Sequence, residues 1–335
     1  MDEHKKKVGW CGTILILLLI LAILIVSLAA YAYNNILGKI NRVDGTEETL
    51  SQSEIEAIEN ETDPVIEGEL EEYDGTLDEN ADLIAQGDHI INILLIGQDR
   101  RPGEGRTRSD SMILCTIDTE KKTLVMTSFL RDLYVDIPDW NGRTYQDNRL
   151  NACYAFGGMG MLDLALEKNF GIQVDHNLEV DFGGFSEIIN IFGGVTVNLT
   201  KAEANYMGQG LKEGSNFLTP EQALQYSRIR YLDSDFGRTN RQRNVLTALF
   251  NSIKTMNADQ LTQLINKILP MMTTDMTNAD ITGYMVKLLP ILPELQISTQ
   301  YIPASGAYKS CYVRGMAVLV PDMEANRAIL RDTLG

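Results

Sequence analysis

IINILLIGQDRRPGEGRTRSDSMILCTIDTEKKTLVMTSF, residues 90–129, contains three apolar runs that set the architecture of this 335-residue chain. Ile90–Ile96 ends at Gly97 and has the composition of a buried strand. Met112–Ile117 and Thr123–Phe129 flank a short polar segment, and this spacing predicts a hairpin. Because a hairpin supplies antiparallel pairs, we expect a mixed sheet rather than a purely parallel one.

After residue 160 the chain alternates between helical and strand patterns. Glycines mark several helix ends, and Thr219-Pro220 followed by Gln222 is a typical helix start. Helices are expected at Gly160–Phe170, Phe185–Phe192, Thr219–Ser227, Thr239–Lys254, Gln260–Ile268, Ala279–Leu289 and Asp322–Leu334, and strands at Leu178–Phe182, Val195–Leu199 and Leu295–Ile302. Strands interspersed with helices predict an α/β fold with a central mixed sheet.

An apolar segment near the N-terminus predicts membrane attachment. Residues 8–38 carry no charge, and residues 12–33 are mostly Ile, Leu, Val and Ala. A helix of that length reaches about 33 Å, enough to cross a bilayer core. Because Lys5, Lys6 and Lys7 precede it, the N-terminus is expected in the cytoplasm and the bulk outside, as a single-pass cell-membrane protein. The alternative is a signal peptide cleaved after Ala30-Tyr31-Ala32, which exports the same residues.

The sequence therefore predicts four parts: a cytoplasmic tail at residues 1–11, a transmembrane anchor at 12–33, an acidic extracellular linker at 34–88 and a large domain at 89–335. The linker has a distinctive charge. Between Asp44 and Asp88 there are 17 Asp and Glu and no Lys or Arg, whereas the rest of the chain carries 29 residues of each sign. Such a composition is typical of a solvated, extended stalk.

The composition argues against several classes of protein. No basic tail or basic domain is present, so nucleic acid is not an expected partner. Three histidines in all leave little basis for His-centred zinc sites or Ser-His-Asp catalysis. GxSxG, HExxH, P-loop and Rossmann motifs are absent. The four cysteines form no CxxC pair, which indicates free thiols, although the sequence leaves a Cys153–Cys311 bridge open.

Arginine is concentrated where active-site loops are expected. Twelve of the 16 arginines fall between residues 100 and 243, interleaved with acidic residues. A hairpin brings the start of one strand next to the end of the other. The residues expected at this rim of the sheet are Asp99, Arg108, Asp110, Arg131 and Asp132. Arginine suits bidentate phosphate binding, and two aspartates without His or Cys suit Mg²⁺. Surface salt bridges are the alternative interpretation.

A further group of arginines is expected in the first turn of the Thr239–Lys254 helix. Arg238, Arg241 and Arg243 there would oppose the positive end of the helix dipole. Their position therefore predicts a nearby anion such as phosphate. Asp233-Ser234-Asp235 also has the spacing of the metal-binding DxD motif of glycosyltransferases, which is a weak signal on its own.

Eight short motifs follow one another in a fixed order. They are Asn92–Asp99 (NILLIGQD), Arg108–Met112 (RSDSM), Ser128–Asp132 (SFLRD), Asn151–Gly158 (NACYAFGG), Val180–Phe185 (VDFGGF), Gly193–Val195 (GGV), Ala223–Arg230 (ALQYSRIR) and Asp235–Arg243 (DFGRTNRQR). Together they resemble the LytR-CpsA-Psr family of cell-wall glycopolymer transferases, over about residues 89–255 and the membrane anchor. Arg149-Leu150 stands where relatives usually have Lys-Ile, which keeps the positive charge.

The resemblance implies a three-layer α/β/α catalytic domain at residues 89–335, preceded by one transmembrane helix. It implies transfer of a glycopolymer (teichoic acid, capsule or another wall polysaccharide) from an undecaprenyl-pyrophosphate carrier to a peptidoglycan sugar hydroxyl, with Mg²⁺. Asp99 and Asp110 would hold the metal, and an apolar tunnel between sheet and helices would hold the polyprenyl tail. The remaining site residues would be Arg108, Arg131, Asp132, Arg228, Arg230, Asp235, Arg238 and Gln242, with the arginines binding the pyrophosphate.

The implied chemistry is phosphoryl transfer, in which positioning and charge neutralisation supply most of the acceleration. A base must accept the hydroxyl proton, and Asp132 and Asp235 are both candidates. One alternative is a polyprenyl-pyrophosphate hydrolase, in which water replaces the sugar hydroxyl. Another is a non-catalytic membrane protein that binds polyprenyl lipid or glycan and has a regulatory role.

Overall fold

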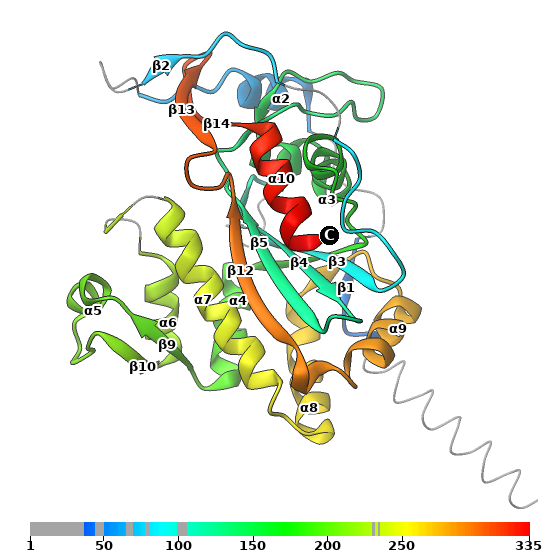
Figure 1. Ribbon diagram of the computed structural model, residues 1–335, viewed down its shortest axis with the longest axis vertical. Coiled ribbons are helices and arrows are strands. Elements are labelled where there is room, and N and C mark those ends of the chain that lie inside the picture. Colours follow the sequence, from blue (N-terminus) through cyan, green and yellow to red (C-terminus); the bar gives the residue numbers. More distant parts are fainter. Residues whose placement is uncertain are drawn as a thin grey trace, which may run out of the picture. The chain divides into compact units, whose positions relative to one another are not determined.

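The computed structural model describes residues 37–43, 50–64, 70–77, 81–98, 106–229, 232–233 and 235–335 (Figure 1). The chain divides into two units, residues 1–40 and 41–335, and only residues 37–40 of the first are described. None of the helices in the described ranges is long and apolar enough to cross a membrane. The anchor predicted at residues 12–33 lies outside these ranges, and so do Asp99 and Arg230.

The second unit is built around a mixed sheet. In the described residues its strand order is β1-β11-β8-β3-β4-β5-β12. Met112 of β4 lies opposite Phe129 of β5 in an antiparallel pair, and β3 also pairs antiparallel with β4. In contrast, β3 runs parallel to β8, and β5 runs parallel to β12. The predicted hairpin and the mixed sheet are therefore confirmed. The strands are β1 (Asn41–Arg42), β3 (Ile90–Gln98), β4 (Ser109–Asp118), β5 (Thr123–Phe129), β8 (His176–Asp181), β11 (Thr273–Thr274) and β12 (Gln296–Ile302).

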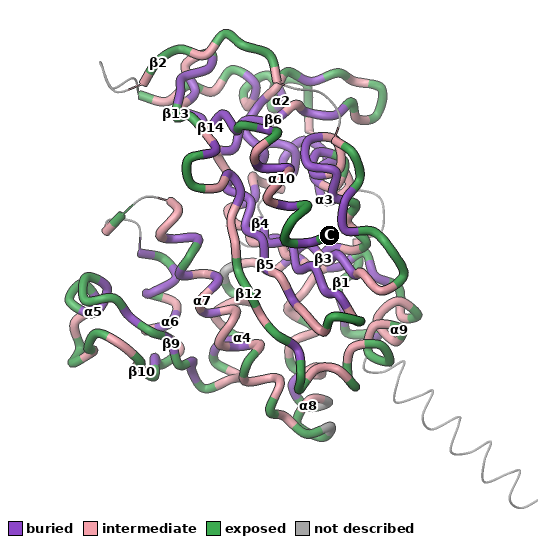
Figure 2. The backbone as a smooth tube through the Cα atoms, viewed as in Figure 1, coloured by how far each residue is buried: buried purple, intermediate pink, exposed green. Residues whose placement is uncertain are grey.

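Helices cover both faces of this sheet, which gives three layers (Figure 1). Successive side chains of a strand point to opposite faces: Leu114 packs in the core beneath α3 and α10, whereas Ile113 packs with residues of α7 and α9. Strands buried on both sides must be apolar along their whole length, which explains the apolar runs, and Figure 2 shows β4 and β5 largely buried. The helices are α3 (Leu150–Phe170), α4 (Phe182–Phe192), α7 (Asp235–Ile253), α8 (Ala258–Ile268), α9 (Asn278–Leu288) and α10 (Met323–Leu334).

Smaller elements surround the three layers. One group forms a separate apolar cluster against α4 and α7 and consists of β9 (Val195–Leu199), α5 (Lys201–Met207), β10 (Gly214–Leu218) and α6 (Pro220–Ser227). Two small sheets consist of short strands. One has the order β14 (Met316–Pro321), β13 (Tyr308–Val313) and β2 (Glu71–Glu72), and the other pairs β6 (Tyr134–Val135) with β7 (Asn148–Arg149). The 3₁₀ turns η1 (Leu269–Met271) and η2 (Leu292–Glu294) precede β11 and β12.

Helix α7 begins earlier than the sequence predicted. Its first residue is Asp235 rather than Thr239, and the Thr239 hydroxyl donates to the Asp235 carbonyl at 2.9 Å instead of capping the helix. Of the three arginines predicted in the first turn, only Arg238 is there. The helix dipole therefore provides no reason to expect an anion beside Arg241 or Arg243.

The acidic stretch is not an extended stalk throughout. Residues 52–59 form helix α2 (Gln52–Glu59), which begins with a capping box between Ser51 and Glu54 and buries Ile55. Glu71 and Glu72 of β2 run parallel to β13. Both segments are short, and a helix of eight residues is marginal by itself. Tertiary packing orders them, which composition alone does not reveal.

The three described cysteines, Cys115, Cys153 and Cys311, are buried and free. Burial raises the pKa of the Cys115 thiol to about 12, so this group stays a neutral, inert core residue. The free-thiol interpretation is confirmed for these cysteines, and Cys153 and Cys311 form no bridge.

Candidate active site

A polar pocket lies at the rim where β4 begins and β5 ends. Its volume is about 570 Å³. The hairpin register places Asp110, near the start of β4, beside Arg131, which follows β5 by two residues. The residues lining this polar pocket are Glu61, Asp63, Thr107, Arg108, Asp110, Arg131, Asp132, Arg149, Asn151 and Ala317. Four of the five residues predicted at this rim line it, and the fifth, Asp99, lies outside the described residues.

Arg131 is the centre of the charged network. Its Nη1 lies 3.2 Å from Asp110 Oδ1, and its Nε lies 3.4 Å from Asp132 and 4.0 Å from Asp235. Asp235, the first residue of α7, also binds Arg238 Nη2 at 2.6 Å. The network thus joins the hairpin rim to the start of α7, two segments more than 100 residues apart in sequence.

Burial and neighbouring charges shift the pKa values of this network in opposite directions. Burial lowers the pKa of Arg131, but the carboxylates of Asp132, Asp235 and Asp110 outweigh burial and raise it overall. Burial raises the pKa of Asp132, and neighbouring Asp235 adds to this, while Arg131 and Arg149 act in the opposite direction. The result is a fixed guanidinium charge beside a carboxylate whose pKa lies above its usual value. This combination is typical of acid–base groups in active sites.

Two guanidinium nitrogens in the polar pocket have unused donor capacity. The Nε atoms of Arg131 and Arg149 are buried and have no hydrogen-bond partner among the described residues. For Arg149 the nearest carboxylate oxygen to Nε is that of Asp132, at 3.6 Å. Buried donors are nearly always satisfied in native proteins. The pocket wall therefore has donor capacity that the acceptor oxygens of a ligand can use.

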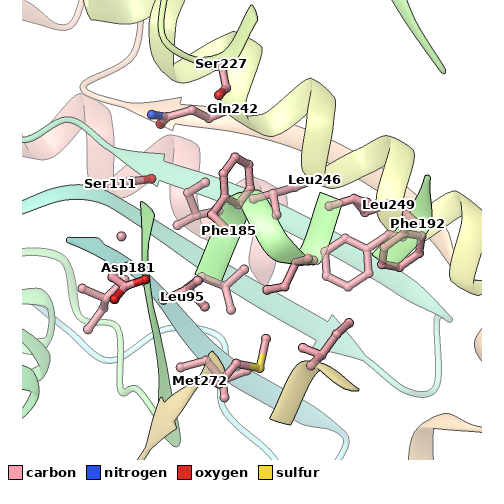
Figure 3. Close-up of a pocket in the computed structure, with 18 of the residues that line it drawn as sticks. Leu95, Ser111, Asp181, Phe185, Phe192, Ser227, Gln242, Leu246, Leu249 and Met272 are labelled. Atoms are coloured by element: carbon pink, nitrogen blue, oxygen red, sulfur yellow. The ribbon is translucent and has the colours of Figure 1, made fainter. Parts of the chain in front are cut away.

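An apolar cavity of about 270 Å³ lies between the sheet and α4, α7 and α8. Figure 3 shows Ser111, Ser227 and Gln242 gathered at one end of this cavity, and Leu249 and Phe192 at the other. Ser111 is the neighbour of Asp110 on β4, so one strand presents consecutive residues to the polar pocket and to the apolar cavity. Because successive side chains of a strand point to opposite faces, the two hollows open on opposite faces of the sheet near the start of β4.

Helix α7 links the same two environments. Along one face it carries Arg238, which binds Asp235, then Gln242 and Leu246, which line the apolar cavity, each one turn after the last. Leu249, Phe250 and Ile253 continue the cavity wall. The polarity of this face therefore changes from charged to amide to hydrocarbon along the helix.

Other predicted residues lie elsewhere. Arg228 is exposed at the end of α6 and lines a separate hollow with Tyr206 and Leu224. Asp233 does not form a paired-carboxylate site with Asp235, because it binds Arg241 at 2.6 Å while Asp235 binds Arg238. In the described part of the chain, no group of three or more His, Cys, Asp or Glu is arranged to hold a metal ion.

The sequence analysis also missed residues of the polar pocket. Arg149 belongs to the arginine-rich region but is not among the predicted site residues, yet its side chain is 7% exposed and lies within reach of three carboxylates, those of Glu61, Asp63 and Asp132. Glu61 and Asp63 belong to the stretch interpreted as a solvated stalk. The signal that could have found them is charge complementarity between this acidic stretch and the arginine-rich rim.

Comparison with known proteins decides the family. A model of the LytR_cpsA_psr family matches residues 48–332. The chain belongs to this family. It is 37% identical over 163 residues to the polyisoprenyl-teichoic acid–peptidoglycan teichoic acid transferase TagU of Bacillus licheniformis, which is 48% of this chain and 51% of TagU.

A relative named as a regulatory protein and a solved crystal structure are also similar to this chain. The chain is 36% identical over 167 residues to the regulatory protein MsrR of Staphylococcus aureus (strain COL), which is 49% of each chain. The chain thus spans about half the length of these two curated relatives. The crystal structure of B. subtilis TagV shares the fold, with a TM-score of 0.60 at 27% identity over 74% of this chain and 97% of TagV.

Proposed function

We propose that this protein transfers a glycopolymer from an undecaprenyl-pyrophosphate carrier to a sugar hydroxyl of peptidoglycan. The observation that carries this proposal is the change of polarity along α7. Asp235 and Arg238 at its start belong to the charged network of Arg131, and Gln242 and Leu246 further along line the apolar cavity. A ligand that fits both hollows has an anionic head and a hydrocarbon tail. A polyprenyl pyrophosphate has this composition.

In this proposal the arginines hold the two phosphates. Arg131 and Arg149 offer unsatisfied donors to the polar pocket. Arg108 also lines this pocket, and Arg238 adds positive charge next to Asp235 at the start of α7. The polyprenyl tail enters the apolar cavity past Gln242 and Ser111. Guanidinium groups positioned around a phosphorus atom also stabilise the negative charge that develops during transfer.

The transfer itself forms one phosphorus–oxygen bond and breaks another. The sugar hydroxyl attacks the phosphorus nearer the glycopolymer, undecaprenyl phosphate leaves, and a carboxylate accepts the hydroxyl proton. We assign this role to Asp132, because it lines the polar pocket and its pKa is raised. Asp235 is the weaker candidate, because its carboxylate binds Arg238 at 2.6 Å.

Asp99 and Asp110 are the proposed Mg²⁺ ligands, and the ion would neutralise phosphate charge when bound. The Asp110 carboxylate supplies the hard oxygen atoms that Mg²⁺ prefers and faces the polar pocket. The polymer could be teichoic acid, which the name of TagU supports, or another wall polysaccharide such as capsule. We also propose that the chain is anchored in the cell membrane at residues 12–33, with the domain outside.

The test uses the full chain in detergent with a synthetic polyprenyl-pyrophosphate-linked saccharide and uncrosslinked peptidoglycan. We expect phosphodiester-linked product with Mg²⁺, none with EDTA, and a loss of at least 100-fold in Asp110→Ala. Glu120→Gln, an exposed carboxylate at the opposite end of the hairpin, is the matched control and should keep wild-type activity.

Two other outcomes point to different functions. Release of free saccharide phosphate without any linked product would indicate a pyrophosphate hydrolase. Tight donor binding without turnover, across several donors and acceptors, would indicate a binding protein with a regulatory role, which the name of MsrR suggests for that relative. Either result would contradict the transferase.

A further inference from the structure

We infer that Glu61 is a built-in competitor for the anion-binding arginines, presented by the chain's own N-terminal acidic segment. Residues 59–63, the acidic arm, connect helix α2 with the next segment of the chain and reach the polar pocket. The inference rests on the proposed function in one respect: it assumes that these arginines bind the phosphates of the donor.

The acidic arm is fastened on both sides of Glu61. On one side Glu59 binds Arg143 Nη2 at 3.4 Å. On the other, the backbone N–H of Asp63 donates to the Gly315 carbonyl at 2.8 Å, and the Asp63 carboxylate accepts from the Ala317 N–H at 2.8 Å. Fixing both ends holds the residue between them over the pocket. The arm is therefore positioned by contacts that do not involve Glu61 itself.

Glu61 faces two of the pocket's arginines. Its Oε2 forms a close ion pair with Arg108 Nη1 and lies 3.7 Å from Arg149 Nη1. A carboxylate oxygen between two guanidinium groups occupies a position that a phosphate oxygen would otherwise take. Both ligands are anions, so they cannot share the position without strong repulsion.

The contact is poorly suited to a permanent structural role. The side chain of Glu61 remains 41% exposed. Ion pairs at such partly exposed positions contribute little stability. In contrast, a diphosphate carries more charge and more acceptor oxygens, and it can also satisfy the idle Nε atoms of Arg131 and Arg149. Donor binding is therefore expected to displace Glu61. The hydrogen bonds of Asp63 with Gly315 and Ala317 keep the arm attached, even if the ion pair between Asp63 and Arg149 is also weakened.

As a consequence, an anion binds in the polar pocket only if it binds the arginines more strongly than Glu61 does. A weak monoanion must compete with Glu61, whereas a polyprenyl pyrophosphate also gains binding from its tail in the apolar cavity. The acidic arm would thus keep free phosphate and other small anions out of the pocket and favour the lipid-linked donor.

The test measures binding of inorganic pyrophosphate by calorimetry to the full chain in detergent, without Mg²⁺ and at low salt. Glu61→Gln keeps the size of the side chain and removes its charge, and we expect affinity to rise about threefold to tenfold. Glu56→Gln removes the same charge from an exposed position of α2 and should leave affinity within about twofold. The gain in Glu61→Gln should shrink at high salt.

Unchanged or weaker binding in Glu61→Gln would overturn the inference, because it would mean that Glu61 orients Arg108 for the ligand. Absence of pyrophosphate binding in both proteins would overturn it as well. A parallel transfer assay separates this result from the proposed function. Tighter binding without any transfer supports the competitor and contradicts the transferase, whereas transfer with unchanged binding contradicts the competitor alone.

Discussion

Arg241 allows a test of which arginines of α7 stabilise the fold and which bind an anion. The sequence places it among the anion-binding residues, but the structure buries it to 2% exposure. Its Nε binds Glu203 at 2.7 Å, its Nη1 donates to the Ile229 carbonyl at 3.1 Å, and its Nη2 binds Asp233 at 2.6 Å. Arg241 therefore connects α5 to the segment that leads into α7.

The stability lost on removing Arg241 follows from the charge that remains unpaired. In Arg241→Met the carboxylate of Glu203, only 8% exposed at its side chain, becomes a buried charge without its partner. Breaking one side of a buried ion pair costs about 3–5 kcal/mol. At about 2–4 °C per kcal/mol, the melting temperature should fall by about 6–20 °C. Thermal unfolding of the full chain, followed by circular dichroism, measures this change.

Two companion variants check the reason for the loss. Asp233→Asn removes the 44% exposed partner and should cost less than about 1 kcal/mol. Glu203→Gln added to Arg241→Met removes the stranded charge but keeps an acceptor for the Thr200 N–H, so most of the stability should return. If Arg241→Met kept its melting temperature but lost pyrophosphate affinity more than tenfold, Arg241 would belong to the anion site after all.

Three further variants probe the proposed base, the apolar cavity and the start of β8. Asp132→Asn should lower transfer by about 10²–10⁴-fold while pyrophosphate binding is kept, and in the wild type the raised pKa of Asp132 should place the acidic limb of the rate profile above the usual aspartate value of about 3.9. An unchanged rate would assign the base to another residue. Leu246→Trp should weaken binding of the lipid-linked donor at least tenfold and leave inorganic pyrophosphate binding unchanged, because the added ring fills only the apolar cavity. Equal loss of both would show that the two hollows are not independent. The hydrogen bond to Asp275 raises the pKa of His176, so its contribution to stability is complete below about pH 6.5 and is lost as pH rises through the folded-state pKa. His176→Asn should therefore be less stable than wild type by under about 1 kcal/mol at pH 5.5, with a difference that vanishes by pH 8.5, as unfolding at the two pH values would measure.

The sequence predicts the sheet and the rim well because their signals are local. Strands buried on both faces must be continuously apolar, so residues 90–129 reveal β3, β4 and β5 directly. Hairpin geometry then forces Asp110 and Arg131 together, and the structure joins them at 3.2 Å. The prediction that α7 begins at Thr239 is wrong, and the reason is also local. Thr239 followed by Gln242 satisfies the capping-box pattern, yet the helix already contains both residues.

The acidic arm could not be predicted, because its order depends on partners far away in sequence. Within residues 50–64 the capping box of α2 is a local contact, but it is too small to offset the entropy of ordering so acidic a segment. The compensating contacts come from Arg143, Arg149 and the backbone of Ala317. A segment of this kind can be recognised from sequence only by asking which basic surface its charges would neutralise.

The positions of the two hollows also constrain the direction of the proposed reaction. In phosphoryl transfer the attacking and leaving oxygens lie roughly in line through the phosphorus atom. If the tail lies along α7 toward Leu246 and Leu249, the leaving undecaprenyl phosphate is on the α7 side of the arginines. The sugar hydroxyl must then approach from the opposite side, through the polar pocket beside Asn151 and the acidic arm. Asp132 lines that pocket, whereas Asp235 is part of α7 itself, so the in-line requirement independently favours Asp132 as the base.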